Sequence, residues 1–569
     1  MKKIVTLAAI AALSCGMIFA AEPAANVSIT DFTGNAKVEW GVDLDAGKTG
    51  FKNEEYIKFV INLFDAGEKT TEANGDVWAE LVMKAGNCKS WSHRLFQIDG
   101  SAADMGQATS PTTGGDVSFD IDVAKLHFYN FYVGIQQGDT LTGEYKFDGA
   151  IRSADNGNAQ WLSNVGPAGF TQGIVAGYAD DNFDFGVDFR SYYDASTQYT
   201  NAYAFAAEAK LKDSNSFAEG LFVDLGGSFA TTDLFYKKAD EGSVEKAYVN
   251  KKEEWVLGYS ANAGYKFKLD DKYFVKPAVG FTGSNVTSTN EGDKNSKAVN
   301  NNSLVAGVIF GWGDTADANA GVYYLDGDMA KKVTPGVSVV AAIPLPETEK
   351  GTDNDKAYSV TTNKALKALI VPSFYSGDLV ENLTAAVYSE MGLLQSVKAA
   401  DRSKGTDDKT INETAATNET FAFAVAAAAK YDIKSDAATI TPQIGFRFAN
   451  GAYFDNNINA TSPLSSNPVF KDMGEQIYIA KKDADNEWTY GYDNFLNLKA
   501  GVNVNGLINN TDLYVVYQSA NILNKTNYGE KTTIKMGGVS AEVDNTLYRK
   551  EGWYNVKLGT LTLGTKISF

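Results

Sequence analysis

The chain has 569 residues, with 53 Gly, only 11 Pro, 12% aromatic residues and a formal net charge of −19. Its apolar and aromatic content is high enough for a packed fold, which excludes an intrinsically disordered chain. The acidic balance excludes nucleic acid as the expected partner, because phosphates attract basic surfaces.

The N-terminus has the layout of an export signal. Residues 1–3 are a basic start, residues 4–19 an almost unbroken apolar run, and Ala20 a small residue at the expected cleavage point. We therefore predict a secretory signal peptide over residues 1–20. The residues before Cys15 loosely resemble a lipobox, so a lipoprotein is the alternative, although the apolar run continues past this cysteine. Cleavage after Ala20 leaves Cys88 alone, which excludes an intramolecular disulfide.

The main structural signal is an alternation of apolar and polar residues with a period of two. From Trp255 to Leu269 nearly every second residue is apolar, and similar ladders cover residues 183–189, 203–211 and 496–504. The first run is longer than an ordinary strand and matches the roughly 9 to 11 residues of a tilted membrane-spanning strand. Beyond the signal, no apolar stretch approaches the roughly 18 residues of a spanning helix.

These patterns predict an all-β protein, a transmembrane antiparallel β-barrel of roughly 16 to 22 strands with long extracellular loops and short periplasmic turns. A β-sandwich also alternates, but the polar faces here are rich in Gly, Ser, Asn and charge, as a water-filled lumen requires. Connections alternate in length as well. Residues 270–272 and 432–437 are predicted turns, and 284–302 and 450–487 predicted loops. The alternation of long and short connections falls out of phase once, over residues 313–364, so one of the hairpins predicted there must be wrong.

Prolines recur at matching places in the predicted hairpins. Pro277 and Pro442 occupy the same position in two similar segments, residues 275–281 and 440–446, and Pro372 is a looser echo. Proline removes a hydrogen bond from a strand ladder and is normally found at a strand start, an edge or a bulge. We therefore expect these prolines near the turns, at the membrane rim.

The C-terminus alternates up to its last residue and ends on an aromatic side chain. Thr562, Gly564, Ile567 and Phe569 together resemble the terminal signal by which the barrel-assembly machinery recognises outer-membrane proteins. We predict that these four residues are an assembly signal and that the machinery is a partner of the chain.

The chain also resembles the treponemal major outer sheath or major surface protein family of spirochaetes. The resemblance rests on residues 35–42 near the start of the mature chain, on the close at residues 566–569, and on overall size and Gly and aromatic content. It implies an abundant, surface-exposed protein of the cell outer membrane, embedded in the lipid bilayer. It also implies a homotrimer that forms large water-filled channels and contacts host extracellular-matrix proteins.

The domain division expected from the sequence has three parts. Residues 1–20 are the signal peptide, residues 21–160 an N-terminal β region, and residues 161–569 the transmembrane β-barrel. The N-terminal region is either the first barrel strands or partly periplasmic. Within it, Glu54 to Phe64 fits a strand or an amphipathic helix, which leaves open an internal plug.

Channel selectivity depends on charged side chains that line the pore. The candidates on the polar faces of the ladders are Asp184, Asp188, Arg190, Glu208, Lys210, Lys266, Lys268 and Arg447. The acidic excess predicts a weak cation preference. The alternative is that these are solvated charges far from any constriction, because wide pores hold many such residues.

The predicted function is a porin-like major surface protein with a water-filled diffusion channel and loops available for host contact. One alternative is an adhesin whose barrel mainly displays long loops, at residues 237–254, 347–363, 399–420 and 456–486. An outer-membrane enzyme is disfavoured, because His93 and His127 are the two histidines of the chain. We predict no catalytic residue, metal site or cofactor, since no clustered Cys/His spacing or phosphate-binding glycine loop is present.

Overall fold

The computed structural model describes residues 28–45, 47–62, 77–85, 119–136, 172–191, 199–237, 248–290, 295–313, 316–317, 332–353, 356–397, 410–412, 415–455, 458, 462, 464, 470, 478–482, 488–492, 494–523, 531–536, 539–544 and 557–568. Within these ranges no helix has the length and apolar character to cross a membrane. The predictions made for residues 1–20, Cys88, His93 and Phe569 lie outside them.

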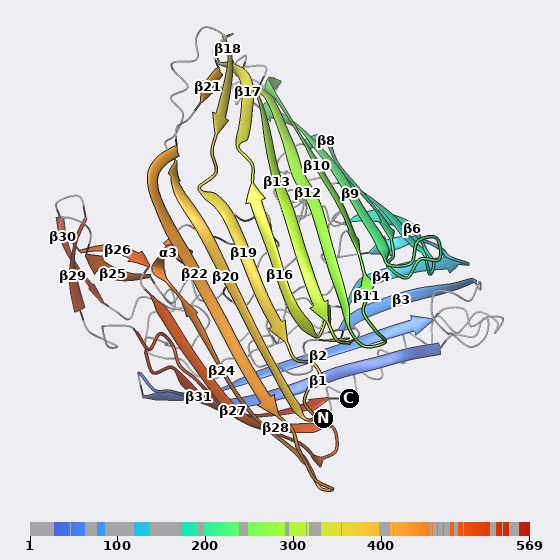
Figure 1. The fold of residues 1–569 in the computed structure, drawn as a ribbon, viewed down its shortest axis with the longest axis vertical. Helices are drawn as coiled ribbons and strands as arrows, with labels where there is room; N and C mark the ends of the chain where they lie inside the picture. Colours follow the sequence, from blue (N-terminus) through green and yellow to red (C-terminus); the bar gives the residue numbers. More distant parts are fainter. Residues whose placement is uncertain are drawn as a thin grey trace, which may run out of the picture.

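The described part of the chain forms a 25-stranded sheet, in which twenty strands pair into a closed antiparallel ring (Figure 1). The ring strands, in order of pairing, are β1 (Ser28–Asp43), β2 (Lys48–Asn62), β3 (Val77–Ala85), β4 (Phe119–Phe128), β5 (Phe131–Gln136), β6 (Gln172–Ala179), β7 (Phe183–Ser191), β8 (Tyr199–Leu211), β9 (Leu221–Lys237), β10 (Tyr248–Tyr265), β12 (Phe274–Asn290), β13 (Asn295–Gly311), β16 (Gly336–Pro344), β19 (Leu366–Tyr375), β20 (Leu383–Val397), β22 (Ala415–Tyr431), β24 (Thr439–Ala449), β27 (Phe495–Ile508), β28 (Thr511–Gln518) and β31 (Thr560–Ser568).

Shorter elements extend the ring strands or lie in the connections. They are β11 (Phe267–Lys268), β14 (Ala316–Asp317), β15 (Lys332–Val333), β17 (Glu347–Asp353), β18 (Lys356–Thr362), β21 (Thr410–Asn412), β23 (Ile433–Lys434), α3 (Gly451–Asp455), β25 (Tyr478–Lys482), β26 (Trp488–Tyr492), β29 (Lys531–Met536) and β30 (Val539–Asp544). β14 with β15, β25 with β26, and β29 with β30 form separate two-stranded sheets.

The ring closes where β1 pairs with β31, in register from Asn35 opposite Ser568 to Asp43 opposite Thr560. Closure satisfies the backbone groups that an open sheet edge would leave exposed, as a membrane-spanning sheet requires. The predicted antiparallel barrel is confirmed, and its strand number falls within the predicted range. Residues 28–136 supply the first five strands of the ring.

Apolar side chains are exposed on the outer face of the ring, and polar side chains are buried on the inner face, which is the reverse of a soluble protein. On β10, Leu257 is 41% exposed, whereas Asn262 on the opposite face is 3% exposed. Exposed Phe, Leu, Val and Ile side chains continue round the barrel, and burying each would contribute about 1.5–3 kcal/mol. Such a large exposed apolar surface indicates a lipid-facing exterior. The other face points into the barrel.

Most of the short connections and most of the long ones lie at opposite ends of the barrel. One end holds short turns such as residues 129–130, 180–182 and 509–510, together with the start of β1 and the finish of β31. At the opposite end consecutive strands are further apart in sequence, as from Gln136 of β5 to Gln172 of β6, and β17, β18 and β21 lie there, at the top of Figure 1. This asymmetry matches the periplasmic turns and extracellular loops of outer-membrane barrels.

Several predicted loops are partly strands. Residues 284–302 were expected to be a long loop, but β12 and β13 continue through them and leave a connection of residues 291–294. Above Phe281 the outward positions of this hairpin turn polar, for example Asn285, so the strands extend beyond the apolar band. The two strands therefore stay paired beyond the point where the alternation of apolar and polar residues ends, and this alternation was the basis for predicting strands. β17 and β18 likewise occupy most of the loop expected at 347–363.

The break in the predicted rhythm has a structural cause. β13 and β16 are separated by residues 312–335 at the end that holds most of the short turns, and β14 and β15 lie in this stretch. The chain then runs through β16 into β17 and returns through β18 into β19. The segment predicted as ambiguous, Glu54 to Phe64, is strand β2 as far as Asn62, so those residues are barrel wall and not a plug helix.

The prolines lie where their chemistry predicted. Pro277 and Pro442 are the fourth residues of β12 and β24, next to the short turns that precede these strands. Pro372 lies near the finish of β19, at the same end of the barrel. This placement at the rim is confirmed.

Short polar side chains fix several turns at this end. Asp180 accepts hydrogen bonds from the backbone N–H groups of Asn182 (2.7 Å) and Phe183 (2.6 Å). Asp270 does the same with Lys272 (2.8 Å) and Tyr273 (2.6 Å). These are turns in which Asp binds the backbone two and three residues ahead. The bonds from Tyr273 and then Lys272 lower the pKa of the Asp270 carboxyl.

Candidate functional site

The inner wall of the barrel holds most of the predicted pore-lining residues. Those of β7 and β8 share the face opposite the exposed aromatic ladder, and they are Asp184, Asp188, Arg190, Glu208 and Lys210. Asp188 and Arg190 form an ion pair two residues apart on one strand, with Arg190 Nε 3.0 and 2.9 Å from the two carboxylate oxygens. The pair is 2% and 3% exposed, so its charges are compensated locally.

The remaining candidates differ in position. Lys266 holds its ammonium over the Phe274 ring, 4.6 Å from the centroid, and Arg447 faces inward beside Asn497. Lys268 was predicted to face the lumen, and its role in a pore stays a prediction. It lies in β11, beyond the inward ladder of β10, and forms an exposed ion pair with Glu219 at the short-turn rim. The roles of the other residues in conduction stay predictions.

A buried lysine at the same end was missed by the sequence. Lys276 on β12 is 6% exposed, pairs with Asp213 in the turn between β8 and β9 (3.0 Å), and lies over the Phe222 ring. Burial is the largest single influence on the pKa of Asp213 and raises it, but Lys276, together with Lys266 and Lys210, outweighs burial and the pKa is lowered. Lys276 precedes Pro277 in an otherwise apolar segment, which was a usable signal of an inward charge.

Part of the inner wall is apolar. Buried side chains on β13, β16, β19, β20 and β22 form a continuous cluster that includes Ile309, Val340, Leu369, Tyr388 and Ala424. Outward neighbours such as Val387 and Phe421 are exposed, which places the cluster on the inside. Water alone would not leave these side chains covered.

The residues that cover this wall come from the connection between β24 and β27. We call the described residues of 450–470 the inner segment: Asn450, α3, Ile458, Ser462, Leu464 and Phe470. Tyr453, Ile458, Leu464 and Phe470 are each at most 2% exposed. Ile458 packs on the inner face of β20, its Cδ1 atom 3.2 Å from the place where Gly392 would carry a Cβ. Residues 456–486 were expected to be an external loop, and for these apolar residues that is wrong.

A buried carboxylate fastens the inner segment to the wall. Glu390 on β20 is 0% exposed and accepts hydrogen bonds from the hydroxyls of Tyr388 and Tyr453. The Phe470 ring completes the cluster, with its centroid 5.8 Å from that of Tyr388 and 5.6 Å from that of Tyr453. A buried carboxylate without donors would cost several kcal/mol; the Tyr388 hydroxyl satisfies Glu390 from its own strand, and the Tyr453 hydroxyl ties it to α3.

The residues predicted as an assembly signal lie at the seam of the barrel. Thr562 and Gly564 face inward on β31, and Ile567 is exposed on the outside. The Tyr514 ring of β28 lies over Gly564, and its hydroxyl donates to Glu39 on β1 (2.8 Å). Gly564 therefore has a structural role, and recognition by the assembly machinery stays a prediction.

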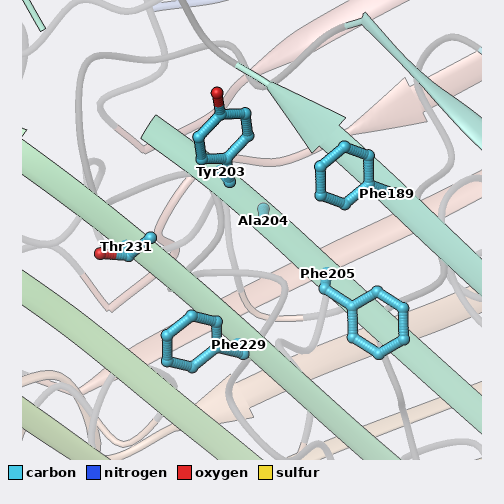
Figure 2. A pocket seen from close by; sticks show the side chains of 6 residues that line it. All are labelled: Phe189, Tyr203, Ala204, Phe205, Phe229 and Thr231. Carbon is cyan, nitrogen blue, oxygen red and sulfur yellow. The ribbon is translucent and has the colours of Figure 1, made fainter. Parts of the chain in front are cut away.

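The outer face near β7, β8 and β9 has a shallow apolar hollow, drawn in Figure 2. Phe189, Phe205 and Phe229 lie in one register across the three strands, and Tyr203 and Thr231 stand beside them. All three phenylalanines are more than 40% exposed. The hollow belongs to the lipid-facing surface.

No family model matches the chain. Two curated relatives do. Major surface protein MspTL of Treponema lecithinolyticum is 25% identical, over 98% of this chain and 99% of the relative. Major outer membrane protein MspA of Treponema maltophilum is 27% identical, over 78% of this chain and 86% of the relative. The chain is similar to treponemal major surface proteins along nearly its whole length. This confirms the resemblance and places the protein in the outer membrane, exposed at the cell surface and in contact with the lipid bilayer.

Solved outer-membrane barrels are distant from this major surface protein. OmpT of Vibrio cholerae in its trimer form is 9% identical over 95% of this chain and 99% of that chain, with a TM-score of 0.30. The transporter YddB of Escherichia coli is 10% identical over 95% and 81%, with a TM-score of 0.33. At these scores neither barrel informs the function of this one.

Proposed function

We propose that this major surface protein is a porin-like diffusion channel across the outer membrane. The carrying observation is the closed ring of twenty strands with charged residues on its inner face. Barrels of about 16 to 18 strands hold an aqueous channel, and barrels of about 22 strands hold a channel filled by a plug. A ring of twenty strands is wide enough to conduct even with part of its inner wall covered.

The wall of β7 and β8 is the proposed water-lined side of the lumen. It combines the compensated pair Asp188–Arg190 with Glu208 and Lys210, which are partly exposed on the same face. Charges of both signs on one wall favour weak selectivity. The acidic excess of the chain sets the proposed preference toward cations.

Planar-bilayer conductance of the refolded chain from Ala21 to Phe569 tests this proposal. Large ohmic steps from a heat-modifiable, folded protein support an open pore. A folded barrel that gives no steps contradicts it. Chemical cross-linking of the same preparation tests the homotrimer that the family resemblance implies, since a trimer band and threefold conductance events are then expected together.

Contact with host matrix proteins is a second proposal, favoured by the long connections at one end of the barrel. The structure sharpens the choice of loop, because residues 399–420 include β21 and the first residues of β22. Removing residues 399–409 spares both strands. Reduced binding of immobilised matrix protein with unchanged heat-modifiability supports a contact there. Unchanged binding removes that loop from the proposal.

A further inference from the structure

The inner segment lies against the part of the barrel wall where a pore would otherwise be lined by apolar residues. Ile458 lies beside Leu366 of β19, Gly392 of β20 and Ala422 of β22, and the Phe470 ring packs on Tyr388 of β20. Ala422, Ala424, Ala426 and Ala428 form the inward face of β22. Their small side chains let the segment approach the wall closely.

The attachment of the segment is specific. Asn450, the residue before α3, extends the pairing of β24 with β22: its backbone N–H donates to the Phe423 carbonyl (2.9 Å), and its side-chain oxygen accepts from the Phe423 N–H (2.9 Å). That oxygen also accepts from the Tyr453 N–H at 3.2 Å, which caps α3. The chain is therefore turned inward at the last residue of the wall, and Glu390 fastens it one helical turn later.

We infer that the inner segment is a fixed constriction of the lumen, held in place by the hydrogen bonds of Glu390 to Tyr388 and Tyr453. The inference rests on the proposed channel function. The segment narrows the lumen from the side of β19 to β22 and leaves the charged wall of β7 and β8 to line the conducting path.

The inference also identifies a residue that sets selectivity. In a helix, residues two apart point in directions about 200° apart. Tyr453 is buried against the wall, and Asp455, two residues later in α3, is exposed. Asp455 therefore points away from the wall that the segment covers, and under this inference its negative charge faces the remaining lumen.

The test compares single-channel conductance of three refolded chains. The first is unaltered, the second has residues 452–470 replaced by a short Gly-Ser bridge, and the third lacks the hairpin β29–β30 (Lys531–Asp544), which forms its own two-stranded sheet. Loss of the inner segment should raise conductance at least about twofold, because conductance follows the narrowest cross-section. Loss of β29–β30 should leave it unchanged. Equal conductance of all three folded chains overturns the inference.

The outcomes separate the two proposals. If the unaltered chain gives no conductance and the shortened chain conducts, the inner segment closes the lumen fully. This result supports the position of the segment in the lumen and contradicts an open channel in the unaltered chain. If both are folded and silent, the channel proposal fails and the constriction with it. Should the shortened chain not fold, Asp455→Lys decides. It should shift the reversal potential toward anions in the full-length chain, whereas Asp436→Lys in an exposed short turn should not. Identical reversal potentials overturn the inference.

Discussion

The seam of the barrel contains a glycine whose replacement should have a measurable and correctable cost. The Tyr514 ring of β28 lies across the inward face of Gly564 on β31, and its hydroxyl donates to Glu39 on β1 at 2.8 Å. One side chain thus links three strands at the point of closure. A Cβ at position 564 would overlap the ring. Gly564→Ala therefore pushes the ring aside and breaks the hydrogen bond to Glu39.

The magnitude follows from two opposing contributions. A hydrogen bond to a charged acceptor contributes about 1.5–3 kcal/mol. Alanine in a strand returns about 0.5–1 kcal/mol relative to glycine, because the unfolded chain is less flexible. We expect Gly564→Ala to lower the free energy of unfolding by about 1–2 kcal/mol.

Urea unfolding of the refolded barrel in lipid vesicles, followed by tryptophan fluorescence, measures this cost. In a Tyr514→Ala background no ring covers Gly564, so the same Gly564→Ala change should be neutral or slightly stabilising. An equal loss in both backgrounds would refute the account. The purified system lacks the assembly machinery. If Gly564→Ala still reduces assembly of the barrel in cells when Tyr514 is already Ala, the reduction supports the proposed assembly signal.

Three further changes test the connections and the wall. Asp45→Ala should cost about 2 kcal/mol in urea unfolding, because its carboxylate accepts three backbone N–H bonds from residues 557–559 at the seam; an unchanged midpoint contradicts this. Asp188→Asn should cost about 3–5 kcal/mol and lower cation preference, because it leaves the buried Arg190 guanidinium without its carboxylate; an unchanged reversal potential removes Asp188 from the pore. Because the folded pKa of Asp270 is lowered, its contribution to stability is present above the unfolded pKa of about 3.9 and is lost as pH falls through the folded value. The urea concentration at the unfolding midpoint should therefore decrease as the pH falls below about 4, and it should decrease less in Asp270→Asn. Parallel pH curves for the two chains would contradict this.

The sequence predicted the barrel because lipid selects one face of every strand. The ladder from Trp255 to Leu269 could be read directly, since each outward position must be apolar at membrane depth. It predicted less well where strands leave the membrane. Asn285 and Asn300 on β12 and β13 pair across the hairpin, with side chains hydrogen-bonded, although their outward face is polar. The strands there are held together by the hydrogen bonds of the hairpin and not by contact with lipid, so the sequence shows no alternation of apolar and polar residues at these positions.

The inner segment could not be found from its own residues. Between Asn450 and Glu487 the chain is rich in Asn, Asp and Ser, and its buried apolar residues Ile458, Leu464 and Phe470 are six residues apart, a wider spacing than the two of a strand or the 3.6 of a helix. Such a stretch is typical of an external loop. Its inward course depends on Glu390 and Tyr388, more than sixty residues earlier in the chain. Sequence reasoning on one segment at a time has no access to that pairing.

The wall beneath the segment does carry a signal in sequence. From Phe421 to Ala429 β22 is apolar on both faces, with exposed or partly exposed residues such as Phe421 alternating with buried alanines. A strand between lipid and water would be polar on its inner face, as β7 is at Asp184 and Asp188. A strand that is apolar on both faces is covered on both, as in sheets packed between two layers. Alanine on the inward side, in place of larger residues, further indicates that the covering element lies close to the backbone. In a β-barrel, a strand with two apolar faces therefore marks where protein, and not water, occupies the lumen.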